Sequence, residues 1–111
     1  MTSSQGIELY IPLNTKQEGQ LSIQGRIRID GHFIGSLYTE SSLEVGPNGF
    51  LEGNADVASA DISGQFKGNL LTHSLCILRS KSRFEGLLDA SFAQMDKGCQ
   101  FKGEVRIKGS L

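Results

Sequence analysis

The side chains best suited to acid–base or metal chemistry are few in this chain of 111 residues, which has two histidines and two cysteines. A catalytic zinc takes three protein ligands, and neither His32 and His73 nor Cys76 and Cys99 form a recognisable ligand set by their spacing. A histidine can also serve as a general base, but both lie where surface or corner positions are expected. We therefore predict no metal site, no cofactor and no catalytic residue.

The charge of the chain is nearly balanced, with 11 Lys and Arg residues against 12 Asp and Glu residues. A nucleic-acid binder needs a long-range positive field that collects phosphates, so this balance argues against DNA or RNA as a partner. No apolar run reaches the roughly 20 residues needed to span a bilayer, and residues 1–6 carry no basic region of the kind that begins a secretory leader. We expect one domain, located in the cytoplasm.

Glycine placement shows how the chain is organised. The 14 glycines are too many for a helical protein and too evenly spaced for a linker. Five copies of one pattern, in which an apolar residue stands two positions before and another two positions after a glycine, place their glycines 18, 15, 18 and 17 residues apart. The copies are Phe33-Gly35-Leu37, Leu51-Gly53-Ala55, Phe66-Gly68-Leu70, Phe84-Gly86-Leu88 and Phe101-Gly103-Val105, and an imperfect partial copy, Ile23-Gly25-Ile27, precedes them.

The alternation inside each copy has a period of two residues, which indicates a strand. Pairs such as Leu43 with Val45 and Leu75 with Ile77, with Ile62 and Phe92 as weaker members of the set, indicate a second short strand between the copies. A unit of about 17 residues with two or three short strands is too short for a propeller blade and lacks helical periodicity, so it fits one coil of a β-helix. We therefore predict an all-β fold, a parallel β-helix of about five to six coils whose equivalent residues stack about 4.8 Å apart.

The columns of this alignment suggest which side chains face the core. The large apolar column should pack inward, with the glycine column leaving space for side chains from the other walls. The residues just before the glycines should point outward, and four of them alternate in sign: Glu52, Lys67, Glu85 and Lys102, after Ile34. A slip of one residue would bury these charges. The same alternation places Cys99 inward and Cys76 outward, so no disulfide is expected between them.

Residues 1–20 lack the repeat and are assigned separately from a β-helix domain over residues 21–111. Apolar residues alternate at the start of this segment, and a polar run, Asn14 to Gln20, follows them. Two interpretations stay open for it: a tail or an extra strand packed on the first coil, and a segment that touches a bilayer, where apolar burial would be repeated along an assembly. The candidates for membrane contact are Ile7, Leu9, Tyr10, Ile11 and Leu13.

The glycine columns resemble those of the bactofilins, which are bacterial cytoskeletal proteins. The resemblance covers roughly residues 20 to 107 and is carried above all by the stretch from Val45 through Gly49, Leu51 and Gly53 to Val57, and by the stretch from Ile62 through Gly64 and Phe66 to Leu70. It implies a right-handed, triangular β-helix that polymerises end to end into non-polar filaments without nucleotide. It also implies attachment to the inner face of the cytoplasmic membrane and a role in localising cell-wall or cell-shape machinery.

The ends of the solenoid are the predicted functional surfaces, because an uncovered end exposes strand edges and a cross-section of the core. The chain itself is then the main partner, with the membrane surface and cell-wall enzymes as further partners and no small-molecule substrate. Candidate interface residues lie in the presumed first coil, at Leu21, Ile23 and Ile27, and in the last coil, at Phe101, Val105 and Ile107.

An enzyme is the alternative interpretation. Hexapeptide-repeat acyltransferases have a left-handed β-helix with an apolar residue at every sixth position, and Leu21, Ile27, Phe33, Val45, Leu51 and Val57 keep that step with one gap at Thr39. Beyond Val57 the step lands on Ser63, Asn69, Leu75 and Lys81. Because the hexad register ends where the glycine register continues, we favour a structural protein that is not an enzyme.

Overall fold

The computed structural model describes residues 7–107, and every regular element in that range is a strand. The strands form two six-stranded parallel sheets. Sheet A contains the short strands β1 (Ile7–Ile11), β3 (Arg26–Ile29), β5 (Ser42–Val45), β7 (Ser59–Ile62), β9 (Leu75–Leu78) and β11 (Phe92–Met95). Sheet B contains the long strands β2 (Lys16–Ile23), β4 (His32–Thr39), β6 (Phe50–Val57), β8 (Gln65–Thr72), β10 (Arg83–Ala90) and β12 (Gln100–Ile107).

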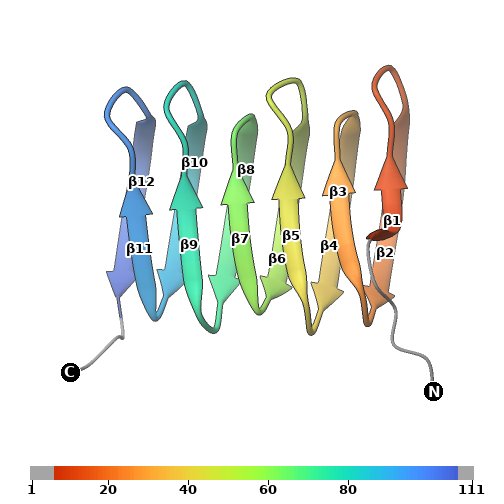
Figure 1. Cartoon of the computed structure of the whole chain (residues 1–111), viewed down its shortest axis with the longest axis horizontal. Helices are drawn as coiled ribbons and strands as arrows, with labels where there is room; N and C mark the ends of the chain where they lie inside the picture. Colours follow the sequence, from red (N-terminus) through yellow and green to blue (C-terminus); the bar gives the residue numbers. More distant parts are fainter. Residues whose placement is uncertain (1–6, 108–111) are drawn as a thin grey trace.

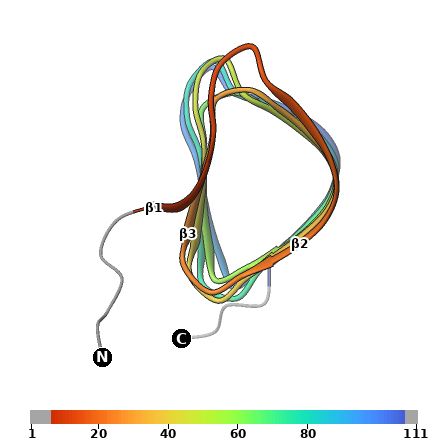
Figure 2. The same ribbon diagram turned by 90° about the vertical axis from the view of Figure 1, so that its right-hand side faces the viewer.

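Each short strand and the long strand that follows it make one coil, so twelve strands build a solenoid of six coils (Figure 1). Viewed along its axis, the solenoid has a roughly triangular outline (Figure 2). The prediction of an all-β fold with a parallel β-helix is confirmed. All long strands have eight residues, so the uneven glycine intervals come from the turns: the turn after sheet A has four residues at 46–49 and two at 63–64.

The glycine column marks the bend in the middle of each long strand. Six glycines pair in register from β2 to β12, namely Gly19, Gly35, Gly53, Gly68, Gly86 and Gly103, and their φ angles lie between +128° and +140°. A Cβ on Gly68 would overlap the carbonyl oxygen of Gly53 in the preceding coil, and the same overlap recurs from Gly35 to Gly103. The glycines are therefore needed for backbone conformation and close stacking of backbones, and not to make room for side chains as predicted.

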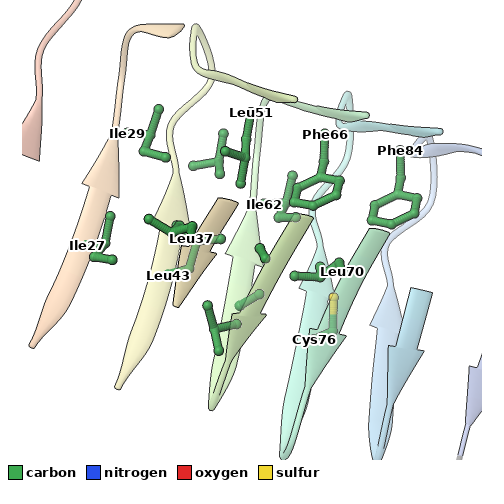
Figure 3. Packing of buried hydrophobic residues seen from close by; sticks show 14 of the residues in the cluster. Ile27, Ile29, Leu37, Leu43, Leu51, Ile62, Phe66, Leu70, Cys76 and Phe84 are labelled. Carbon is green, nitrogen blue, oxygen red and sulfur yellow. The ribbon is translucent and has the colours of Figure 1, made fainter. Parts of the chain in front are cut away.

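The core is a stack of apolar columns, and Phe66, Phe84 and Phe101 form a run of stacked rings in the column that also contains Phe33 and Leu51. Successive rings are parallel, with centroids 5.0 Å apart. Small residues in the facing column of sheet A, Ala60 and Cys76, lie in the coils that carry Phe66 and Phe84, whereas Leu43 lies in the coil that carries Leu51 (Figure 3). Large and small residues therefore compensate one another in these three coils, which keeps a narrow core densely packed. The coil of Phe33 departs from this, because it carries the large Ile27 in the facing column.

Three details of the predicted register are wrong. Cys76 is fully buried and points into the core, while Leu75 and Ile77 face outward, because Cys76 pairs with Ala60 in the inward column. Phe92, predicted to belong with Leu43, Val45, Leu75 and Ile77 in the apolar set between the copies, is 50 % exposed on the outer face. Ile23-Gly25-Ile27 is not a copy of the repeat, since Gly25 lies in the turn between β2 and β3 and Gly19 pairs with Gly35.

The outward charge column has the predicted register. Glu52 pairs with Lys67, Lys67 with Glu85, and Glu85 with Lys102 along neighbouring strands. Within residues 9–107, no ion pair of 4.0 Å or shorter joins these side chains. Their alternation therefore acts through solvent-screened attraction, which contributes little per pair.

Residues 7–20 belong to the first coil. Strand β1 pairs with β3, and β2 begins at Lys16, so the boundary predicted between residues 20 and 21 falls inside β2. The polar run at the start of β2 forms the outermost edge of sheet B.

Candidate assembly interface

The C-terminal end of the solenoid exposes the columns that form the core elsewhere. In the last coil Met95, Val105 and Ile107 are 42 %, 36 % and 50 % exposed, although Leu78, Leu88 and Ala90 at the same positions one coil earlier are buried. Phe101 is half-buried because one face of its ring stacks on Phe84. No described strand lies beyond β11 and β12, so this end resembles a cut through the core.

The same end presents unpaired backbone. Strand β12 pairs only with β10, and β11 only with β9, among the strands that the structure describes. Their outer N–H and C=O groups are free to bond a further strand, and an eight-residue edge is long enough to template one. Apolar surface and strand edges together make this end a candidate assembly surface.

The N-terminal end is less apolar. Gln17 occupies the position of the phenylalanine column in β2, and Leu21 and Ile23 are half-buried against the core. Ile27, predicted to lie in the first coil, lies in the second and is only 1 % exposed because Leu9 of β1 pairs with it. Ile27 therefore does not reach the end of the solenoid, whereas the other five predicted interface residues lie in the terminal coils.

Met95 is a residue of the C-terminal end that the sequence analysis missed. It lies two positions after Ala93 and pairs with Leu78 at the end of sheet A. The signal that identifies it is the inward column Val45, Ile62, Leu78 and Met95, which could be read only after Cys76 had been placed inward.

The five candidates for membrane contact divide into two groups. Ile11 is buried in the core and Leu9 packs against it, so neither offers a membrane surface. Tyr10 and Leu13 are exposed, and the side chain of Ile7 lies outside the described part of the chain. A strand that alternates buried and exposed residues explains the pattern that also suggested a lipid contact.

Polar contacts fix the outer face of sheet A near Tyr10. The Tyr10 hydroxyl donates to Asp30 Oδ2 over 2.9 Å, and the Arg28 guanidinium donates to Asp30 and lies 3.2 Å from Glu44. The hydrogen bond from Arg28 lowers the pKa of Asp30, and the bond to Asp30 raises the pKa of Tyr10. The Asp30 carboxylate thus remains ionised at neutral pH and links β1 to β3, while Arg28 links β3 to β5 through Glu44.

The histidines are not brought together. His32 in β4 stacks on Phe50 with ring centroids 4.6 Å apart, and His73, in the turn after β8, lies 2.8 Å from the Asp56 carboxylate. No group of three His, Cys, Asp or Glu side chains suited to a metal occurs among the described residues. Both histidines have structural neighbours that account for their positions.

Comparison with known families agrees with this geometry. A family model described as bactofilin, polymer-forming cytoskeletal, matches residues 9–106. The chain belongs to the bactofilin family. Bactofilins are structural, polymer-forming proteins, so the open apolar ends described above belong to a family whose members assemble. Searches of the curated proteins and of the solved structures give no match. Over residues 7–107 there is no helix long and apolar enough to cross a membrane.

The two cysteines should differ sharply in reactivity. Burial, with a contribution from Asp61, raises the pKa of Cys76 to about 12, whereas Cys99 is half-buried in the last coil. The thiolate is the reactive form, and at pH 8 a pKa near 12 leaves roughly one thiolate in 10⁴. We expect a thiol reagent to modify one cysteine in the native protein and two after denaturation. Peptide mapping that finds Cys76 modified first would contradict the inward placement.

Proposed function

We propose that this bactofilin polymerises end to end, through the open ends of its solenoid, into filaments that form without nucleotide. The filaments act as a cytoskeletal scaffold that organises cell-shape or cell-wall machinery in the cytoplasm, at the inner face of the membrane. The observation that carries the proposal is the C-terminal end, where Phe101, Met95, Val105 and Ile107 expose a continuous apolar surface beside free strand edges.

Covering this surface stabilises the polymer in two ways. Apolar area removed from water contributes about 25 cal/mol per Å², and the edge strands gain backbone hydrogen bonds that water otherwise supplies. A contact between ends that repeats along one axis does not close on itself, so the product is a fibre and not a ring or a small oligomer. Nothing in this geometry requires a nucleotide or a metal.

Electron microscopy and sedimentation of the purified full chain test the proposal. We expect unbranched filaments one or a few solenoids wide, formed at moderate salt without added nucleotide, and Cys99 protected from thiol reagents in the pellet relative to the supernatant. A discrete trimer at all concentrations would contradict the proposal and favour the hexapeptide-type alternative.

A further inference from the structure

The turns that follow sheet A line one edge of the solenoid, which we call the loop edge. It consists of residues 12–15, 30–31, 46–49, 63–64, 79–82 and 96–99, and it stands along the top of Figure 1. Its four longer turns share one construction, in which the fourth backbone N–H donates to the first carbonyl, as Ser82 does to Arg79 over 3.1 Å. These turns project beyond the shorter ones and reach an approaching surface first.

Over residues 7–107, the loop edge is the one edge of the triangle with net positive charge. Together with the first residue of each long strand it carries five cations and two carboxylates, a net charge of +3: Lys16, Arg79, Lys81, Arg83 and Lys97 against Asp30 and Asp96. The glycine bend carries two cations and four carboxylates, a net charge of −2: Lys67 and Lys102 against Glu18, Glu52, Glu85 and Glu104. Counted in the same way, with the first residue of each following short strand, the turns after sheet B within residues 7–107 carry Arg26 against Glu40, a net charge of 0.

The cations of the loop edge gather on the last two coils. Lys81 and Lys97 are exposed on two neighbouring turns, which approach each other where a Cβ on Gly98 would lie 3.6 Å from Ser80 Cβ. Arg79 is held by Asp61 through contacts of 2.9 and 2.7 Å. Within residues 9–107, Lys81, Arg83 and Lys97 are in no ion pair, so their charges face solvent.

Lys81 adopts a backbone conformation that lysine disfavours. Its φ angle is +73°, while the equivalent turn positions in the first and last coils carry Asn14 and Gly98, residue types that tolerate the left-handed region. Asparagine or glycine would adopt this φ angle with less backbone strain than lysine. A strained residue that packing does not require suggests a role for its side chain.

The N-terminal half of the loop edge offers apolar tips instead of charge. Leu13 is 53 % exposed at the tip of the first turn, and Pro47 is exposed at the tip of the third. Asp30, the carboxylate nearest to them on this edge, is bonded to Arg28 and Tyr10. One edge therefore combines insertable apolar tips with unpaired cations, the combination that binds an anionic bilayer.

We propose that the loop edge is the surface through which the filament lies on a membrane with anionic headgroups. Lys81, Lys97 and Arg83 contact the headgroups, and Leu13 enters the interface. The proposal rests on the proposed function, because each cation near an anionic surface strengthens binding only about fivefold. A single solenoid then binds weakly, and repetition of the edge along a filament provides avidity.

Flotation of full-length protein with vesicles tests this surface. Vesicles of phosphatidylcholine alone are compared with vesicles containing 30 % phosphatidylglycerol, the probe for anionic headgroups. We expect binding to the anionic vesicles only, and at least a tenfold loss in the Lys81→Glu/Lys97→Glu variant. The matched control, Arg26→Glu/Lys67→Glu, makes the same charge change at exposed positions of the other faces and should lose less than threefold.

A second variant separates binding from folding. Lys81→Asn removes one cation and relieves the left-handed strain, so its melting temperature should stay equal or rise while anionic vesicle binding falls severalfold. If the two double variants lose vesicle binding equally, the proposal is overturned, because binding then depends on the net charge of the protein and not on the loop edge. Equal binding to both vesicle types would overturn it in favour of apolar contact alone. Binding abolished by deleting residues 1–6 and kept in Lys81→Glu/Lys97→Glu would overturn it in favour of the N-terminal segment.

Sedimentation without vesicles distinguishes failure of this surface from failure of the proposed function. If wild-type filaments form but do not bind anionic vesicles, the proposal that the loop edge binds membranes is overturned, and the proposal of end-to-end assembly is retained. Absence of filaments would overturn the proposed function and, with it, the avidity on which the loop edge depends. A third outcome would show that the loop edge binds a second copy of the chain and would overturn its assignment to the bilayer. In that outcome wild-type filaments form bundles, Lys81→Glu/Lys97→Glu filaments stay separate, and neither binds vesicles.

Discussion

Phe101→Arg is expected to abolish sedimentable polymer while leaving the solenoid folded. In the free chain the substitution removes a ring that stacks on Phe84 on one side only, which should cost about 1–3 kcal/mol of folding stability. In a polymer whose ends cover this position, the guanidinium would be buried without a partner, at a cost of several kcal/mol for each contact. The substitution should therefore destabilise the contact between solenoids more than it destabilises the folded chain.

The matched control is Phe92→Arg, the same chemical change in the same coil. Phe92 lies in β11 of the same terminal coil, but it is 50 % exposed on the outer face of sheet A and does not belong to the inward columns that the end exposes, so this variant should sediment like wild type. The measurements are the pelleted fraction, electron micrographs and thermal melts of the wild-type, Phe92→Arg and Phe101→Arg proteins. A folded Phe101→Arg protein that still forms filaments would exclude the C-terminal end from the interface.

Loss of folding in Phe101→Arg would not end the test. Ile107→Arg places the same charge at a position that is already 50 % exposed and contributes less to the core. The corresponding variant at the other end is Ile23→Arg, half-buried in β2. Filaments that persist in both variants would refute end-to-end assembly through either end.

The repeat could be predicted from sequence because the strands have constant length and the glycine has one backbone role per coil. The competing hexad register is also real over part of the chain: from Leu21 to Val57 its members all face the core, including Thr39, whose hydroxyl donates to the Gly25 carbonyl over 2.6 Å. It ends because the next coil has a one-residue turn at Ala58 and a two-residue turn at 63–64. The pattern of an apolar residue at every sixth position therefore ends because the turns change length, and not because the composition of the core changes.

What could not be predicted depended on contacts between coils. Leu75-Cys76-Ile77-Leu78 is apolar throughout, so alternation alone cannot orient it, and the inward placement of Cys76 follows from its pairing with Ala60. The first copy of the repeat was missed because Gln17 stands where the other copies have a large apolar residue, and only the pairing of Gly19 with Gly35 reveals it. Exposure of Met95 follows from its place in the last described coil, which the local sequence does not encode.

The glycine column offers a prediction about stability with an internal control. Gly68→Ala would force a left-handed backbone on alanine and drive its Cβ into the Gly53 carbonyl oxygen. Gly19 has nearly the same φ angle, +131°, but no atom lies within 4 Å of the Cβ position because no coil precedes it among the described residues. The two substitutions therefore share the conformational cost and differ in the steric one.

We expect Gly19→Ala to lose about 1–3 kcal/mol from backbone strain alone, and Gly68→Ala to lose about 3–6 kcal/mol because overpacking against a backbone adds to that strain. Thermal and denaturant unfolding in the Phe101→Arg background, where polymerisation does not contribute to stability, measures both. At about 4–8 °C per kcal/mol for a domain of this size, the larger loss should leave Gly68→Ala mostly unfolded at 37 °C. Equal losses in the two variants would mean that the column requires glycine only for its backbone conformation, and that the close stacking of successive bends contributes nothing.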